Sequence, residues 1–203
     1  MVNSAFSAFL LTVGLIGGTN FSTFLGSDAA LVDQSGTTSM EPGYITRYVA
    51  GFTSELEYQR MYGLRAELLF SVRGGKYESE LEDQGGELET QLQMRYLDLP
   101  VMAYFRLSEE TSVMLGPYLS WYISGDSQYR LSLSGRPASG IDEPIERDLI
   151  RNPDAGLIAG ASYNIDDHVS FHARYGYGVR PIPAGSDKDM RHGWLQIMMG
   201  FEF

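Results

Sequence analysis

The sequence of 203 residues contains no cysteine. That absence excludes disulfides, a catalytic thiol and any metal site built from thiolates. Positive charge is also scarce, because 15 Lys and Arg stand against 26 Asp and Glu and leave a formal net charge of −11. Such an acidic balance argues against a nucleic-acid partner and against simple attraction to an anionic membrane surface. We accordingly expect no nucleic-acid partner, and no pattern in the chain indicates a cofactor.

Long apolar runs are missing as well. No segment reaches the roughly 18 to 20 consecutive apolar residues that a transmembrane helix needs, and the mean hydropathy is −0.17. This low average does not exclude a membrane β-barrel, whose strands alternate lipid-facing with lumen-facing residues. The chain holds 23 Gly, 8 Pro and 12% aromatic residues, a composition that favours a turn-rich β protein.

The end of the chain shows a clear alternation. Along residues 195–203 every second side chain is large and apolar, and those between are mostly polar or small. A period of two indicates a strand with one apolar face. Such a strand at a terminus must be paired, and a closed barrel pairs a terminal strand routinely. We expect it to pair with a first strand near residues 13–21.

Strands of the same period can be marked at residues 11–23, 44–58, 63–77, 90–106, 111–125, 153–165, 168–181 and 192–203. The connections near 59–62, 108–110 and 166–167 are tight, whereas those at 24–43, 78–89, 126–152 and 182–191 are long and polar. Short turns on one side and long loops on the other are typical of outer-membrane barrels. The sequence predicts an all-β fold: an eight-stranded antiparallel up-and-down transmembrane β-barrel with short periplasmic turns and long extracellular loops.

This barrel domain should span residues 11–203, preceded by an N-terminal segment at 1–10 that could be the remnant of a signal peptide. Residues 5–16 are apolar enough for the core of such a peptide, but no Lys or Arg precedes them. No internal repeat or linker divides the chain. We expect a monomer.

One face of the strands is apolar and uncharged, whereas the other carries the charges. A soluble, lipocalin-like barrel would turn the apolar face inward. Glycine argues against this, because the crowded interior of an eight-stranded barrel favours residues without a side chain. The charged face carries nearly all of Gly14, Gly18, Gly51, Gly116, Gly156, Gly160, Gly176, Gly178 and Gly200. The apolar face should therefore contact lipid. The fourth strand changes parity, which predicts either a β-bulge near Tyr96 or a part that projects beyond the bilayer.

The charges of the lumen face are nearly balanced, which predicts pairing because an isolated buried charge is costly. We expect an ion-pair network that plugs the lumen, with a selective pore or proton path as the alternative, formed by Glu55, Glu57, Arg65, Glu67, Arg95, Asp98, Arg106, Arg174 and Glu202. In it, Asp98 could reach Arg65, Arg106 or Arg174. Rings of the outer face should form two girdles at the membrane interfaces, with Tyr48, Trp121 and Tyr177 toward the loops and Tyr58, Tyr163 and Phe203 toward the turns.

Residues 96–105, Y-L-D-L-P-V-M-A-Y-F, resemble the Y-L-E-I-P-L-L-L-K-Y motif of the PorT-like outer-membrane barrels of Bacteroidota, with Asp98 in place of Glu. The resemblance extends to residues 14–22, 155–163 and 173–178 and to the closing G-F-E-F. It implies an eight-stranded barrel in the outer membrane of a Gram-negative bacterium. It also implies insertion by the assembly machinery, which reads a C-terminal aromatic strand, but no settled activity.

We expect a structural or anchoring role, or recognition through the loops, among outer-membrane lipids and lipopolysaccharide. A narrow channel associated with a secretion system and a lipid-modifying enzyme are the alternatives. A hydrolase would need Ser170, His172 and Glu202 within hydrogen-bond reach, yet these should point into the lumen, so no catalytic residue is assigned. The histidines form no metal motif. The acidic loop at 78–89 could hold a divalent cation, and the loop at 126–152 is the expected recognition element.

Overall fold

The computed structural model describes residues 9–32, 39–59, 61–81, 86–133, 139–185 and 187–203. Eight long strands form the wall of the molecule: β1 (Phe9–Leu25), β4 (Ile45–Tyr58), β5 (Tyr62–Leu81), β6 (Gly86–Arg106), β7 (Thr111–Leu133), β9 (Asp154–Asn164), β10 (Val169–Gly178) and β11 (Arg191–Glu202). Smaller elements lie in the connections: β2 (Leu31–Val32), β3 (Ser39–Met40), β8 (Ser139–Pro144) and the 3-10 turn η1 (Arg147–Leu149). No helix in these ranges is long and apolar enough to cross a membrane.

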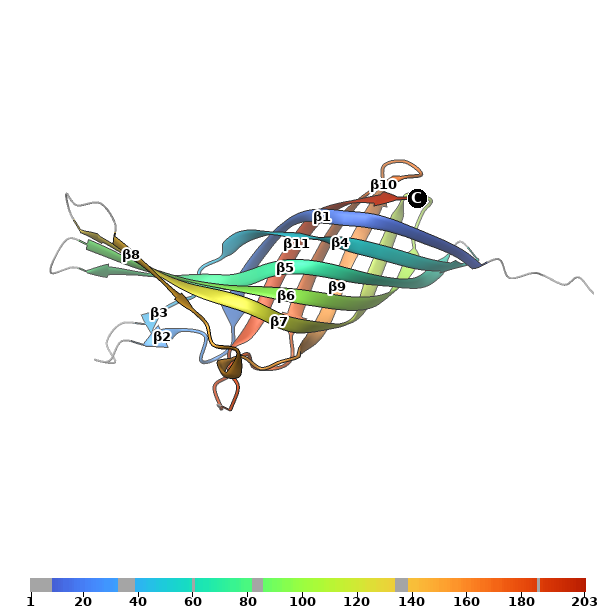
Figure 1. Cartoon of the computed structure of the whole chain (residues 1–203). Coiled ribbons are helices and arrows are strands. Elements are labelled where there is room, and N and C mark those ends of the chain that lie inside the picture. Colours follow the sequence, from blue (N-terminus) through green and yellow to red (C-terminus); the bar gives the residue numbers. More distant parts are fainter. Residues whose placement is uncertain (1–8, 33–38, 60, 82–85, 134–138, 186) are drawn as a thin grey trace, which may run out of the picture.

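The wall strands close into a ring (Figure 1). Every neighbouring pair is antiparallel, and β1 pairs with both β4 and β11, as the predicted closure requires. The register of that last seam places Leu15 opposite Phe201 and Phe21 opposite Leu195. The eight-stranded antiparallel barrel predicted from the sequence is confirmed.

Alternation along each strand separates two environments. In β5, Arg65 and Glu67 are buried in the lumen, whereas Leu64 and Leu68 on either side of them are exposed on the outer wall. The same period of two repeats in β4, β9, β10 and β11. Apolar side chains thus cover the outside of the barrel, and the charged face lies inside. In water such a continuous apolar exterior would drive aggregation, which is why it requires lipid.

Glycines make room for the crowded interior. A Cβ atom built at eight of the nine strand glycines named above would come within 2.6 Å of another atom, and Gly178 is the exception at 3.3 Å. At Gly176 the obstacle is the ring of Trp194, at 2.1 Å. Close approach of backbone and rings inside the barrel therefore requires residues without a side chain, as the sequence predicted.

A β-bulge lies where β6 and β7 pair, at the register shift between Arg95 and Tyr96. Its position agrees with the prediction, but the strand that carries the extra residue does not. Ile123 of β7 is unpaired between Tyr122 and Ser124, so the parity of β7 changes. In β6 the parity is constant, and Met94 and Tyr96 point inward with Asp98. The expectation that β6 changes face was wrong, because apolar side chains also fill the loop end of the lumen.

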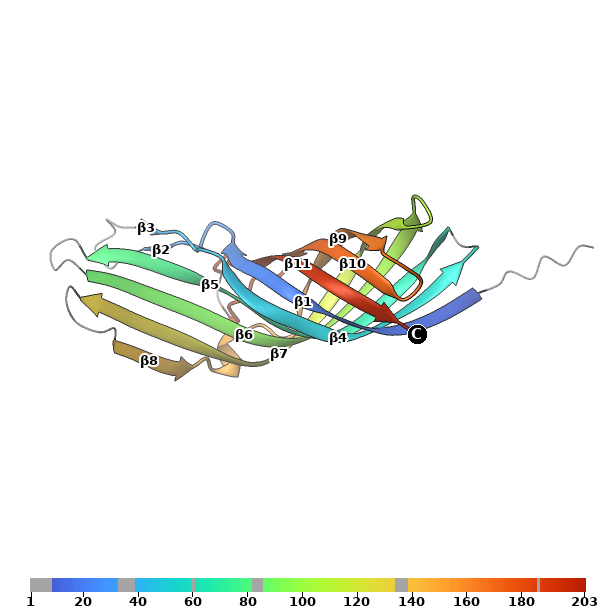
Figure 2. The same cartoon turned by 90° about the horizontal axis from the view of Figure 1, so that it is seen from above.

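Two of the predicted long loops are mostly strand. β5 and β6 stay paired as far as Leu81 and Gly86, so the expected loop at 78–89 is the end of a hairpin. β7 likewise continues past residue 125 to Leu133, and β8 pairs with it. The result is a sheet of β5, β6, β7 and β8 that protrudes well beyond the barrel wall (Figure 2). We call this sheet the extension. The polar residues of these two segments indicated loops, and this was misleading. Pairing with the long neighbouring strands provides hydrogen bonds for the backbone of polar segments as well.

Candidate functional site

The turn end of the lumen is filled by a network of buried ion pairs. Arg65 donates from Nε to Glu67 at 2.7 Å and from Nη1 to Glu55, and its Nη1 lies 3.5 Å from Glu202. The second oxygen of Glu67 accepts from Arg174 Nη1 at 2.6 Å. Arg65, Glu67 and Arg174 are almost entirely buried. Glu67 is thus shared by two guanidinium groups, an arrangement that offsets part of the cost of desolvating all three charges.

Closer to the turns, Arg106 pairs with Glu57 at 2.6 Å, and both side chains are partly open to solvent. They line a pocket of about 660 Å³ at the mouth of the barrel. The remaining charged residues of this pocket are mostly acids, Glu55, Glu109, Glu110, Asp166, Asp167 and Glu202. Asp166 accepts hydrogen bonds from the backbone N–H groups of His168 and Val169, which hold the pKa of its carboxyl below the usual range. We call this pocket the turn-end vestibule.

The middle of the lumen is organised around Arg73. Its guanidinium pairs with Asp98, donates to Ser120 Oγ at 2.7 Å and lies 3.8 Å from Asp154. Asp98 also accepts from Ser71 at 2.6 Å. The expected partners of Asp98 were therefore wrong, because Arg73 occupies the same level of the lumen while Arg65, Arg106 and Arg174 lie nearer the turns.

Aromatic rings surround the Arg73 guanidinium on its remaining sides. Its central carbon lies 4.6 Å from the ring centre of Tyr96, 5.5 Å from that of Tyr118 and 5.7 Å from that of Trp194. Such stacking stabilises a desolvated cation. Sequence reasoning missed this cluster, although Arg73 shares the parity of Arg65 and Glu67 in the same strand. Nothing in the sequence indicated that the rings converge on it.

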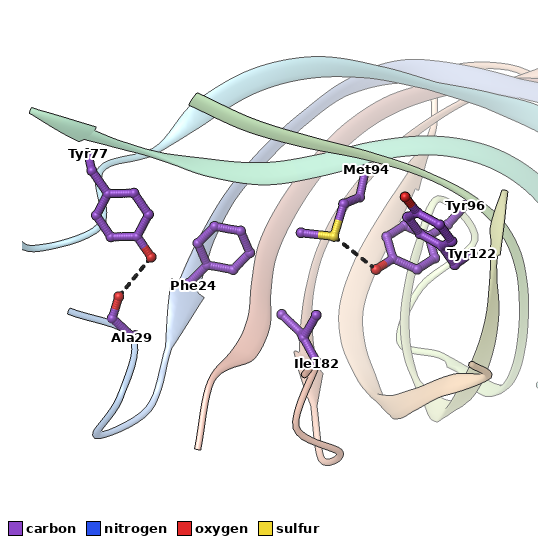
Figure 3. Packing of buried hydrophobic residues seen from close by; sticks show 7 residues of the cluster. All are labelled: Phe24, Ala29, Tyr77, Met94, Tyr96, Tyr122 and Ile182. Atoms are coloured by element: carbon purple, nitrogen blue, oxygen red, sulfur yellow. Dashed lines mark hydrogen bonds between the residues drawn. The ribbon is translucent and has the colours of Figure 1, made fainter. Parts of the chain in front are cut away.

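An apolar plug closes the lumen at the loop end (Figure 3). It consists of buried side chains from four strands and two connections: Phe24, Ala29, Tyr77, Met94, Tyr96, Tyr122 and Ile182. The Tyr77 hydroxyl donates to the Ala29 carbonyl at 2.8 Å. Tyr96 belongs to both this plug and the Arg73 cluster. The lumen thus ends in apolar side chains toward the loops, beyond the level of its ion pairs.

Arg95 lies outside the turn-end network in which the sequence placed it. It pairs with Asp126 at 2.7 Å, where both side chains are about one-third exposed. The partner, Asp126, is on β7 beyond the bulge, at the base of the extension. The prediction that Arg95 contributes to the lumen network was wrong, because the odd-numbered residues of β6 face away from the lumen and the bulge places Asp126 of β7 on that same outer side.

The serine and histidine weighed as catalytic residues do form a pair. Ser170 Oγ lies 2.8 Å from His172 Nε2, and both side chains are buried. The required carboxylate is absent from this pair, because Glu202 lies beside Arg65 and His172 Nδ1 has no hydrogen-bond partner among the described residues. Ser170, His172 and Glu202 therefore do not form a catalytic triad.

The six girdle residues all lie on the outer wall. Tyr48, Trp121 and Tyr177 are exposed on the loop half of the barrel, and Tyr163 and Phe203 are exposed at the turn end, where Tyr58 is half-buried as the last residue of β4. In the acidic segment at 78–89, Glu78 faces Glu89 across the hairpin, and residues 82–85 are outside the described residues. No group of three or more potential metal ligands occurs in the described ranges.

Comparison with known proteins places this fold among outer-membrane barrels. Residues 9–183 match the outer membrane protein beta-barrel domain family. The structure resembles Neisserial surface protein A with a TM-score of 0.51 and 14% identity, over 94% of this chain and 97% of that chain. Ail, the attachment invasion locus protein of Yersinia pestis, gives a TM-score of 0.45 and 15% identity over 95% and 98%. At these identities the likeness shows the fold alone. No curated protein matches the sequence significantly.

Proposed function

The chain belongs to the outer membrane protein beta-barrel domain family, and we propose that it is a recognition protein whose plugged barrel anchors the extension on the outside of a Gram-negative outer membrane. The observation that carries this proposal is the extension itself. β5, β6 and β7 continue far beyond the closed wall, and β8 adds to them only there. A barrel that served only as an anchor would not need this ordered sheet.

The extension offers an unpaired strand for binding. β8 pairs with β7 along one edge, and none of the described strands pairs with its other edge. Tyr129 and Ile141 face each other across the β7–β8 pair, and both side chains are exposed. A free edge with exposed rings and aliphatic groups can accept an extended segment of a partner as an additional strand.

The lumen supports anchoring over transport. Charged, aromatic and apolar side chains fill it from the turn end to the apolar plug, and an eight-stranded barrel leaves little space beyond its own side chains. We therefore do not propose a channel in a secretion system. The incomplete Ser170–His172 pair likewise supports no lipid-modifying enzyme.

Further features of this proposal come from the sequence. We propose that the chain is a monomer, that its C-terminal strand is read by the outer-membrane assembly machinery, and that its turns face the periplasm. The narrower resemblance to PorT-like barrels of Bacteroidota, based on residues 96–105, is part of the same proposal. So is a divalent cation at the acidic hairpin tip, where Glu78 and Glu89 lie opposite each other.

Crosslinking in intact cells would test the proposal. A photoreactive residue replaces Ile141 on the free edge or, as the matched control, the equally exposed Leu115 of the barrel wall. We expect a discrete adduct with an external partner from position 141 and none from position 115. In a second variant, an Asn-Gly turn replaces residues 127–144 and the photoreactive residue replaces Tyr48. This variant should insert into the membrane like the wild type. A correctly inserted protein with no adduct from any position of the extension would contradict the recognition role.

A further inference from the structure

Three arginines near the rim of the loop end lack an acidic partner. Arg147, Arg151 and Arg180 have no carboxylate oxygen within the 4.0 Å of an ion pair among the described residues, although the chain carries an excess of acids. They belong to two segments that run side by side. Arg151 N–H donates to the Ile182 carbonyl at 2.7 Å, and Arg180 donates from Nη1 to the Pro153 carbonyl at 2.7 Å. The three arginines thus lie near one another, in a region that also carries Glu146 and Asp148.

Two of these arginines line a shallow pocket of about 380 Å³, together with Asp148, Ile150, Asn152, Ala184 and Gly185. We call it the rim pocket. The Nε atom of Arg151 is buried there without a hydrogen-bond partner in the described structure. Two guanidinium groups against the single carboxylate of Asp148 leave the lining positive. Two guanidinium groups that line one pocket can both donate hydrogen bonds to the oxygens of a phosphate group.

The rim pocket lies close to two of the predicted girdle residues. Asn152 accepts a hydrogen bond through Oδ1 from the backbone N–H of Tyr122 at 3.3 Å, and Tyr122 directly follows the girdle residue Trp121. On the opposite side, Arg180 follows the girdle residue Tyr177 by three positions. In Figure 1 the short coiled turn η1 lies at the rim where the barrel ends and the extension begins. Interfacial aromatic rings lie at the depth of the lipid headgroups.

An apolar side chain accompanies the charges. Leu149, within η1 and between the two pocket arginines in sequence, is 59% exposed. A site for a soluble anion has no use for an exposed leucine, whereas a lipid presents an apolar chain beneath its charged group. We propose that the rim pocket binds a phosphate group of an outer-leaflet lipid, such as the phosphates of lipid A. This inference rests on the proposed function, because it requires the loop end to face outward.

In this proposal Arg147 and Arg151 each donate a charge-assisted hydrogen bond to an oxygen of the phosphate group. Arg180 adds positive potential from the adjacent segment, and Leu149 packs against an acyl chain. The phosphate would sit away from the carboxylate of Asp148. The extension above the rim would then be held at a fixed height over the membrane surface.

A binding measurement in a phosphate-free maltoside detergent tests this assignment. The full chain is refolded, its folded state is verified by gel mobility without heating, and microscale thermophoresis measures binding of lipid A. The probes are bisphosphorylated lipid A, the same lipid A after removal of both phosphates, and inorganic phosphate. The variants are Arg147→Gln, Arg147→Gln combined with Arg151→Gln, and the matched control Arg130→Gln, an exposed arginine of the extension that also lacks an ion pair among described residues.

We expect bisphosphorylated lipid A to bind more tightly than the dephosphorylated lipid. Arg147→Gln should weaken that binding by about tenfold, the effect of one charge-assisted hydrogen bond, and the double variant should abolish the preference for phosphate. Arg130→Gln should bind like the wild type. If the double variant fails to fold, the binding of lipid A by the Arg147→Gln variant alone decides the question, because residue 147 is exposed.

Three results would overturn the assignment. They are equal binding of both lipids, an Arg130→Gln effect as large as that of Arg147→Gln, and saturation by inorganic phosphate with no binding of lipid A. The last of these would identify a soluble anion as the ligand. All three leave the proposed recognition role intact, because that role is tested by crosslinking from the extension.

Discussion

The central guanidinium carbon of Arg73 lies 4.6 Å from the centre of the Tyr96 ring, at the level where the lumen changes from charged to apolar. Below this contact, toward the turns, arginines and acids share the lumen with buried apolar side chains such as Met102 and Met198. Above it, the apolar plug excludes water. Tyr96 takes part in both regions, so this contact joins the two halves of the packed interior. The predictions below test that interior and the orientation of the wall around it.

Removing the Arg73 charge should destabilise the barrel strongly. We expect Arg73→Met to lower the free energy of unfolding by about 3 to 5 kcal/mol, because Asp98 and Asp154 would then be buried without a cation. Urea unfolding in lipid vesicles measures the change. Adding Asp98→Asn to Arg73→Met should recover part of the loss. Equal stability of wild type and Arg73→Met would contradict this account of the lumen.

The pair Arg191–Asp189 provides the matched control for that experiment. Its charged groups lie 2.5 Å apart, as close as in the lumen, but both side chains are about one-third exposed. Solvent screens such pairs, so Arg191→Met should change stability by about 1 kcal/mol or less. A loss as large as that of Arg73→Met would show that burial does not set the difference.

The chain has two tryptophans, and they should report opposite sides of the wall. Trp121 is 37% exposed on the outer face, whereas Trp194 is 2% exposed in the lumen. In vesicles of brominated lipid, we expect strong quenching of fluorescence in the Trp194→Phe variant, which retains only Trp121. The Trp121→Phe variant, which retains Trp194, should be quenched weakly. The reverse pattern would mean that the apolar face is not the lipid-facing one.

Neighbouring glycines of β1 should differ sharply in their tolerance of a methyl group. A Cβ at Gly18 would lie 2.1 Å from the Ile197 carbonyl oxygen, but at Gly17 the nearest atom would be 3.5 Å away. We expect Gly18→Ala to cost about 1 to 3 kcal/mol of stability, the usual effect of overpacking. Gly17→Ala should be nearly neutral in the same unfolding assay. Similar losses at both positions would remove crowding as the explanation for the glycines.

The filled lumen predicts an absence of ion flow. Planar bilayers containing the purified wild-type protein should show no conductance steps. A variant that combines Arg65→Ala, Glu67→Ala and Arg174→Ala removes the three most deeply buried charges of the turn-end network and leaves the more exposed Glu55 and Glu202. The apolar plug should still prevent conduction. Steps from the wild type would contradict the anchoring role. Steps from the triple variant alone would show that the ion pairs, rather than the apolar plug, close the lumen.

Much of the fold follows from local patterns. The period of two predicted the eight wall strands to within a few residues, except where β5, β6 and β7 continue into the extension, and the glycines identified the crowded face. The ion-pair partners were less predictable. Arg65 and Glu67 are two residues apart in one strand, so their contact is local. Arg73 and Asp98 meet only because of the register between β5 and β6, which no local pattern specifies.

Apart from Arg95 and the part of β7 beyond its bulge, the sequence by itself determined which side chains face outward and which face the lumen, because alternation is a property of each extended strand alone. Only the tertiary structure decided which levels of the lumen are charged or apolar, where β7 bulges, and that the polar hairpins continue as an ordered sheet. These features depend on how neighbouring strands are offset around the closed ring, and each offset adds to the next. The rim pocket also depends on strand pairing, because the β9–β10 hairpin brings residues 147–152 beside residues 180–185.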